Sequence, residues 1–264
     1  MKLSLIVGSI NRSHLLRHCV PSWFRFTKPD ELILINDGIK DDTEVIFNEW
    51  REREPNVNFI YKHSGNSEYR GPTFAHNWGA KVASSEIVAF TDPEVMFVTD
   101  AIGIVKRGLE ENPNRHIGVG ILYRVRERVR LSPEELADPV RIIQRPEVVT
   151  WQHGHESVNT EITRFKDVMG YYFGACTKEL YLRMGGKDER FVGFGAEDID
   201  FFGRLSRAGI FHFIDNDIVA IHLYHEGAPR HAMDLAEENF EMMLENERNR
   251  VMVANEGREW GMLG

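Results

Sequence analysis

The chain has few cysteines and no long apolar run, and each absence excludes a class of protein. Its two cysteines, Cys19 and Cys176, provide neither a disulfide framework nor the spacing of a zinc site. The opening residues, MKLSLIVGSINR, contain an apolar run that is too short for a signal peptide or a membrane span. We therefore expect a reduced, cytoplasmic protein without a membrane-spanning segment.

Net positive charge is also missing. The formal net charge of −9 argues against a long, non-specific nucleic-acid track. The basic residues that cluster locally alternate with apolar ones, as on the solvent face of a strand: Arg124, Arg126, Arg128 and Arg130. With 42% hydrophobic and 28% charged residues, and no repeat or low-complexity segment, the 264-residue chain predicts a well-buried globular protein.

The first half of the chain alternates short apolar runs with amphipathic stretches. This alternation predicts an α/β fold with a mostly parallel central sheet flanked by helices. Helices are expected to begin at Ser13, at Asp42 and near Thr73. The expected strands are Leu3 to Val7, Glu31 to Asn36, Val57 to Tyr61, Ile87 to Thr91 and, in the second half, Gly118 to Val125.

Polar residues follow three of these strands. Asn11, Asp37 and Asp92 each come shortly after a strand ends. Open α/β sheets bind ligands outside the carboxyl ends of their strands. The three residues therefore predict one site, provided that their strands are neighbours in the sheet.

The sequence Asp92-Pro93-Glu94 places two carboxylates directly after a buried strand. Hard divalent cations prefer oxygen ligands, and a nucleotide diphosphate needs such a cation to neutralise its charge. The segment therefore indicates a metal and phosphate platform. An ordinary Asp-Pro-Glu turn is the alternative.

Three carboxylates, Glu197, Asp198 and Asp200, follow a glycine-rich turn in the segment GFGAEDIDFFGRL. The apolar residues after them have helical spacing, so the acids are expected at a helix N-terminus, where free amide groups stabilise negative charge. Glycines let a backbone approach a ligand closely, which favours a functional site. A capped helix with solvated acids is the structural alternative.

His222 belongs to the apolar run IVAIHLYH. Strand alternation puts His222 and Tyr224 on one face and Leu223 and His225 on the other. His222 is then either a hydrogen-bonded core residue or a metal ligand, whose neutral imidazole would complete a carboxylate site.

Residues 144–167 form a polar region without a clear element, and long irregular regions are often substrate lids or loops. Aromatic and imidazole faces suit sugar rings or bases. We expect an acceptor groove formed by this region and the residues that follow it, with core packing as the alternative for its aromatic members, and its candidate residues are Trp151, His153, His155 and Tyr172.

Taken together, these segments resemble the GT-A-fold glycosyltransferases, above all the inverting family-2 type and the related galactosyl- and N-acetylgalactosaminyltransferases. The resemblance covers Leu3 to Glu226 and is carried by LSLIVGSINR, ELILINDGIKDDT, GPTFAHNWGAKVASSEIVAFTDPE and GFGAEDIDFFGRL. Three positions depart from the family pattern. His76 stands where the family has Arg, Asn36 replaces an acid, and the metal-binding DXD motif has become Asp92-Pro93-Glu94.

The resemblance implies metal-dependent transfer of a sugar, with inversion, from a nucleotide sugar to a hydroxyl group. UDP-sugars are the favoured donors, and the acceptor is a sugar, a glycan or another hydroxyl-bearing polymer. It implies a Mn²⁺ or Mg²⁺ ion on Asp92, Glu94 and His222, and Asp198 as the general base beside Glu197, with the assignment between these two acids open. The implied donor-binding residues are Asn11, Arg12, Asp37, His76, Asn77 and Asp92.

The resemblance also suggests how the chain is divided. Residues 1–230 are expected to form a GT-A domain, with residues 1–115 as its nucleotide-binding half and residues 116–230 as its acceptor and catalytic half. Residues 231–264 are expected to form a helical extension. The stretch from Ala232 to Val253 is amphipathic, so it is predicted to be a helix that packs on the catalytic domain or on a second subunit of a homo-oligomer.

Two other classes of protein stay open. A sugar-nucleotide pyrophosphorylase shares a similar core but needs a glycine-rich loop with a basic residue after the first strand, where this chain has GSINRSH. A non-catalytic sugar- or nucleotide-binding module would lose the acids that this chain keeps. Release of free nucleotide from a panel of donors would distinguish the enzyme from the module.

Overall fold

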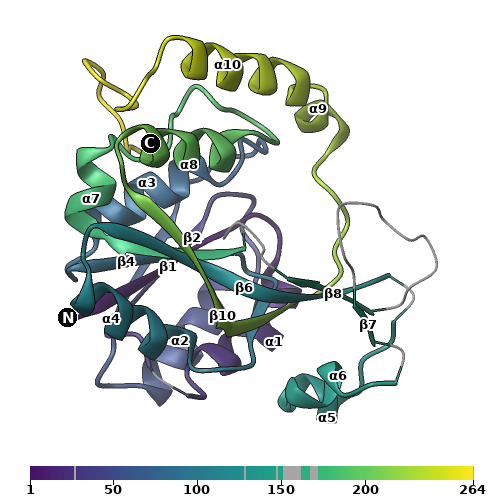
Figure 1. Ribbon diagram of the computed structural model, residues 1–264. Helices are drawn as coiled ribbons and strands as arrows, with labels where there is room; N and C mark the ends of the chain where they lie inside the picture. The colour runs from purple at the N-terminus through teal and green to yellow at the C-terminus, as the bar shows by residue number, and fades with distance from the viewer. Residues whose placement is uncertain (27, 128, 147, 151–161, 167–171, 264) are drawn as a thin grey trace.

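The central feature of the computed structural model is one large twisted sheet; the structure describes residues 1–26, 28–127, 129–146, 148–150, 162–166 and 172–263 (Figure 1). In the described part, ten strands form this sheet in the order β3-β2-β1-β4-β9-β6-β10-β5, with β8 beside β6 and β7 beside β8. The strands are β1 (Leu3–Ser9), β2 (Glu31–Asn36), β3 (Asn58–His63), β4 (Ile87–Thr91), β5 (Val95–Phe97), β6 (Arg115–Val125), β7 (Val148–Thr150), β8 (Ile162–Lys166), β9 (Phe173–Thr177) and β10 (Phe211–His222).

The amino-terminal half of the sheet is parallel. β2 and β4 pair with β1 on either side, and β3 pairs with β2, all in parallel register. The expected α/β fold is therefore confirmed. Since β2, β1 and β4 are neighbours, their carboxyl ends bring Asn11, Asp37 and Asp92 to one edge of the sheet.

Helices cover both faces of the sheet (Figure 1). Contacts place α1, α2 and α4 on one face, and α3, α7 and α8 on the other. The described helices are α1 (Ser13–Trp23), α2 (Thr43–Arg53), α3 (Thr73–Val82), α4 (Ala101–Glu111), α5 (Pro133–Ala137), α6 (Val140–Ile143), α7 (Lys178–Arg183), α8 (Glu197–Arg207), α9 (Arg230–Met233) and α10 (Ala236–Arg248).

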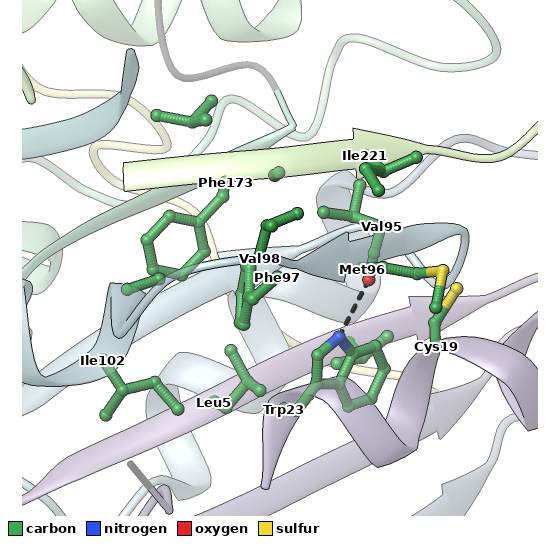
Figure 2. Close-up of a cluster of buried hydrophobic side chains, with 14 of the residues drawn as sticks. Leu5, Cys19, Trp23, Val95, Met96, Phe97, Val98, Ile102, Phe173 and Ile221 are labelled. Atoms are coloured by element: carbon green, nitrogen blue, oxygen red, sulfur yellow. Dashed lines mark hydrogen bonds between the residues drawn. The ribbon is translucent and has the colours of Figure 1, made fainter. Parts of the chain in front are cut away.

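The core between α1 and the sheet fixes the short strand β5. Figure 2 shows the Trp23 indole, whose Nε1 donates to the carbonyl oxygen of Val95 at 2.9 Å. The Ser22 hydroxyl accepts from the Phe97 amide at 3.0 Å, so two bonds hold β5 against α1. Because Glu94 directly precedes β5, this core holds one side of the candidate site in place.

The carboxyl-terminal residues pack against one of the helices that cover the sheet. α10 packs on α8, as Figure 1 shows. The expected single helix from Ala232 to Val253 is wrong: the short α9 ends at Met233, α10 begins at Ala236 and ends at Arg248, and Arg250 has a left-handed φ of 53°. Left-handed backbone at Arg250 is incompatible with a continuing right-handed helix. In the described part of the chain, no helix is long and apolar enough to cross a membrane.

Candidate active site

Two adjoining cavities open at the carboxyl edge of the parallel strands. One has a volume of about 540 Å³ and the other about 560 Å³, and both are lined by Ile10, Arg12, Tyr69, His225 and Gly227. Cavities of some hundreds of Å³ are the size of small-molecule sites. The first cavity also contains the predicted acids, so we call it the acidic cavity; the second contains Asn11 and Gly38 and we call it the Asn11 cavity.

One wall of the acidic cavity carries a cluster of potential metal ligands. One ligand atom each from Glu94, His222 and His225 lies within 4.8 Å of the others. His225 Nε2 is 2.8 Å from Glu94 Oε1, and His222 Nε2 is 3.7 Å from the same oxygen. Glu94 leads into β5 and His222 ends β10, which pair with each other, so the sheet itself brings the two together.

The chemistry of this cluster fits a divalent cation. Burial lowers the pKa of His222 to about 4, so its imidazole is neutral at physiological pH and its ring nitrogens can act as ligands. Burial alone would raise the pKa of Glu94, but the hydrogen bond from His225 and the charges of His225, His222 and Arg12 together outweigh burial, so the net pKa is lowered. Glu94 Oε2 and His222 Nδ1 are buried without a hydrogen-bond partner, which leaves lone pairs for a ligated ion.

The structure brings together only two of the three predicted metal ligands, which were Asp92, Glu94 and His222. Glu94 and His222 meet as expected, whereas Asp92 does not belong to the cluster and lines the floor of the acidic cavity. Burial, followed by the charge of Glu94, raises the pKa of Asp92 well above its usual range. His225, not Asp92, is the third residue of the cluster. Strand alternation does not apply to it, because β10 ends at His222 and the chain then turns so that His225 lies beside Glu94.

The acidic motif begins a helix, as its sequence predicts. Gly193 and Gly195 have φ values of 84° and 94°, and Ala196, the residue before α8, has a φ of 70°. A Cβ on Gly193 would lie 3.0 Å from the Ala232 carbonyl oxygen, so this turn needs glycine for both its conformation and its packing. Glu197 and Asp198 follow and line the acidic cavity.

The three acids of the motif have different environments. Burial, then the charge of Asp198, raises the pKa of Glu197 to about 7. Asp200 instead points inward, where its Oδ2 accepts from Arg204 Nε at 2.7 Å and both side chains are fully buried. Asp200 is therefore a structural residue, and the acids that face the cavity are Glu197 and Asp198.

Sequence reasoning missed Lys187. Its Nζ donates to Oδ1 of Asp198, and its side chain is only 7% exposed. Burial alone would lower the pKa of Lys187, but the charges of Asp198, Glu197 and Asp92 and the hydrogen bond to Asp198 together outweigh burial, so the net pKa is raised. A lysine directly after the pair Gly185-Gly186 is the signal that the sequence offered, and it is a weak one.

Of the two expected donor-binding residues of α3, His76 lines the acidic cavity and Asn77 lies beneath it. Asn77 is fully buried. Its side-chain oxygen accepts from the Lys187 amide at 2.9 Å and from Tyr181 Oη at 2.7 Å. Its side-chain nitrogen donates to the Lys187 carbonyl oxygen at 2.8 Å. These bonds position Lys187 from beneath the cavity. His76 lines the cavity, and burial, then the charge of Lys187, lowers its pKa well below the usual range, so it is a neutral group.

Asp37 lies behind the cavity wall and is fully buried. Both of its oxygens accept from Arg70, Oδ2 from Nε at 2.9 Å and Oδ1 from Nη2 at 2.8 Å. Arg70, which the sequence did not single out, leads into Gly71, which lies against Gly193. This bidentate pair thus ties the end of β2 to the segment that carries Tyr69 into both cavities.

The expected acceptor residues are divided between described and undescribed parts of the chain. Trp151, His153 and His155 lie outside the described residues. Tyr172 lines the acidic cavity and packs edge-on against His222, with ring centroids 5.0 Å apart. Beside the acids, the cavity mouth is lined by exposed apolar side chains that the acceptor prediction did not include: Phe194, Ile199 and Met233.

Comparisons with known proteins find glycosyltransferases among the proteins that this chain resembles. A search of curated proteins finds the uncharacterized glycosyltransferase EpsJ of Bacillus subtilis, 26% identical over 59% of this chain and 44% of the relative. It also finds the validoxylamine A glucosyltransferase of Streptomyces hygroscopicus subsp. jinggangensis, 24% identical over 85% of this chain and 56% of the relative. The chain thus spans about half the length of these curated relatives.

Solved structures share the fold at low sequence identity. The mannosyltransferase PcManGT from Pyrobaculum calidifontis, in complex with GDP-Man and Mn²⁺, has a TM-score of 0.55 at 19% identity, over 84% of this chain and 56% of that one. GalNAc-T7 with UDP, GalNAc and Mn²⁺ has a TM-score of 0.64 at 13% identity, over 93% of this chain and 48% of that one. Residues 15–219 match the model of the glycosyltransferase-like family 2, and the chain belongs to this family.

Proposed function

We propose that this chain is a metal-dependent, inverting glycosyltransferase that moves a sugar from a nucleotide-sugar donor to an acceptor hydroxyl. The observation that carries the proposal is the acidic cavity, in which a carboxylate–imidazole cluster faces a pair of acids at the start of α8. A leaving diphosphate and an attacking hydroxyl need these two kinds of group on opposite sides of the transferred sugar.

The donor would lie across both cavities. Its nucleotide fits the Asn11 cavity, and its diphosphate fits the junction that Arg12 lines, beside the cluster of Glu94, His222 and His225. A divalent cation held there would neutralise the charge that develops on the leaving diphosphate. Two imidazoles and one carboxylate favour Mn²⁺ over Mg²⁺, because Mg²⁺ prefers oxygen ligands alone. The solved relatives, whose structures contain Mn²⁺ with GDP-Man or UDP, support this choice.

Asp198 would act as the general base. It removes the proton of the acceptor hydroxyl as the oxygen attacks the anomeric carbon, from the face opposite the departing nucleotide. Glu197 would bind the acceptor beside it, and Asp92 would face the donor from the cavity floor. The exposed Phe194, Ile199 and Met233 give the acceptor an apolar surface at the cavity mouth.

Incubation with UDP- and GDP-sugars, Mn²⁺ and a panel of sugar and glycan acceptors tests the proposal. Free nucleotide and a mass-shifted acceptor are expected with the wild type. For Asp198→Asn we expect a loss of kcat of at least about 100-fold, with donor affinity retained, since a general base contributes about 10²–10⁴-fold. Donor binding without nucleotide release, for every donor and acceptor, would point to a sugar- or nucleotide-binding module instead.

A further inference from the structure

The acidic cavity contains a buried cation that the proposed reaction has not yet used. Lys187 lines this cavity together with Asp92, Glu94, Glu197 and Asp198, so four carboxylates share it with one ammonium group. Lys187 donates directly to Asp198 Oδ1. Burying a charge is costly unless it is paired, and a lysine in this place therefore calls for an explanation beyond packing.

The backbone around Lys187 does not depend on its ammonium group. The Lys187 amide donates to Asn77 Oδ1 at 2.9 Å, and the Lys187 carbonyl accepts from Asn77 Nδ2 at 2.8 Å and from Asn255 Nδ2 at 2.7 Å. These bonds would hold the segment with any side chain at this position. The ammonium group is thus free to serve the cavity rather than the fold.

Neutral groups surround the ion pair on its inner side. The titratable side chains that face it are His76 of α3, Asp92 after β4, His116 of β6, Tyr172 before β9, Tyr181 of α7 and Glu197 of α8. Burial lowers the pKa values of His76 and His116 and raises that of Tyr181, so these three are uncharged at neutral pH. Lys187 is therefore the cation that faces Asp198 among these groups.

We propose that Lys187 is a positioning residue for the transfer reaction, holding Asp198 as an ionised carboxylate in one fixed orientation so that Asp198, and not Glu197 or Asp92, takes the acceptor proton. The inference rests on the proposed function. Lys187 occupies Oδ1 of Asp198, which leaves Oδ2 for the incoming proton. As the bond between the acceptor oxygen and the anomeric carbon forms, the bond from that carbon to the diphosphate breaks, and the hydroxyl proton passes to Oδ2.

Removing the ammonium group should change the pH dependence of the reaction. Lys187→Met keeps an unbranched side chain, one atom shorter than that of lysine, but leaves Asp198 among like charges, which favours its protonated form. Since only the ionised form acts as a base, the acid limb of the kcat profile should move to higher pH by about 1–3 units. We expect kcat at pH 7 to fall at least about tenfold and to recover at alkaline pH, with little change in the donor KM.

Two further variants make this test specific. Lys187→Arg keeps the positive charge and should return the acid limb toward its wild-type position. Lys106 forms a comparable pair with Asp30 at 2.6 Å, away from the cavity, so Lys106→Met is a matched control that should leave the profile unchanged. A loss of kcat in Lys187→Met that is equal at all pH values, with no shift of the limb, would overturn the proposal.

A measurement without turnover separates this inference from the proposed function. Carbon-13 NMR titration of the aspartate carboxyl groups, with Asp198→Asn used for assignment, should show Asp198 taking up its proton at higher pH in Lys187→Met than in the wild type. An unmoved Asp198 titration refutes the role of Lys187 even if transfer occurs. Absence of transfer in the wild type, together with a moved titration, refutes the proposed function and leaves the ion pair established.

Discussion

At the scale of single residues, the candidate site contains groups whose surroundings separate their protonation states. Glu197 and Asp198 are adjacent in sequence, yet their surroundings differ. Asp198 accepts a hydrogen bond from the Lys187 ammonium group, whereas burial and the charge of Asp198 raise the pKa of Glu197 to about 7. Environments that differ in this way allow two neighbouring carboxyl groups to have different roles. The sequence, which left the assignment between these acids open, has no means of showing the difference.

The raised pKa of Glu197 predicts a pH-dependent cost in stability. A carboxyl with a pKa of 4.5 when unfolded and about 7 when folded contributes fully at pH values below 4.5, and this contribution is lost as the pH rises to about 7. Glu197→Gln should therefore be more stable than the wild type at pH 8, by on the order of 3 kcal/mol at most, and should gain nothing at pH 4. Urea unfolding at both pH values measures this difference. Equal stability of the two proteins at pH 8 would contradict it.

His225 is predicted to be a ligand of the metal ion. Its Nε2 is 2.8 Å from Glu94 Oε1, so its loss removes one of three ligands. We expect His225→Ala to weaken the Mn²⁺ affinity by about 10–100-fold or more, as loss of supporting groups around metals does. His18 lies on α1, and His18→Ala is the control. Isothermal titration with MnCl₂ decides the question, and undiminished Mn²⁺ affinity in His225→Ala would exclude this histidine as a ligand.

At the scale of elements, the apolar runs in the sequence predicted the bounds of the buried strands. The sequence placed β2 at Glu31–Asn36 and β4 at Ile87–Thr91 with the bounds that the structure has, because both strands are buried along their whole length. It placed Cys176 at the end of a strand, as in β9, but did not predict that β9 pairs with β4 and β6 in antiparallel register. Such pairings join segments that are far apart in the chain and carry no local signal.

The carboxyl-terminal helix illustrates a second limit of the sequence. Apolar spacing predicted an apolar buried face, yet α10 buries Asn239, Met243 and Asn246 and leaves Phe240 half exposed. Asn239 Nδ2 donates to the carbonyl oxygens of Val192 and Phe194 at 2.9 and 3.0 Å. The helix therefore satisfies the polar backbone of the glycine turn, a requirement that only the folded structure reveals.

The Asp37–Arg70 ion pair joins the end of β2 to the segment before α3, so its loss should affect how these elements are held together. Asp37→Ala would leave Arg70 without its two bonds and release the segment that carries Tyr69. We expect a weaker UDP affinity, by roughly tenfold or more, and a smaller change in kcat, since donor contacts act in the ground state and the transition state alike. Arg70→Lys, which loses the bidentate geometry, should behave similarly. Calorimetric titration with UDP measures both variants; wild-type affinity in both would mean that the pair does not shape the donor site.

At the scale of the whole molecule, the carboxyl-terminal residues are joined to the acidic cavity through a buried polar network. Asn246 Nδ2 of α10 donates to Asp200 Oδ1 at 2.8 Å, and Asn246 Oδ1 accepts from Arg190 Nη2 at 2.7 Å. Asn255, beyond α10, donates to the carbonyl oxygens of Gly185 and Lys187. The segment thus holds both the helix α8, which begins with the acidic motif, and the loop of Lys187.

This network predicts that the carboxyl-terminal segment stabilises the candidate site of its own chain. Asn246→Ala leaves a buried carboxylate oxygen of Asp200 without a partner, so we expect a loss of about 1–3 kcal/mol of unfolding free energy. Asn249→Ala, at the exposed end of the same helix, is the matched control and should change stability by less than about 0.5 kcal/mol.

A second variant tests the whole segment. Truncation of the chain after Arg230 removes the entire network and should abolish cooperative unfolding. Thermal unfolding and light scattering measure fold and size together. A truncated chain that keeps its melting temperature but changes its oligomeric size would show that the segment serves subunit assembly instead.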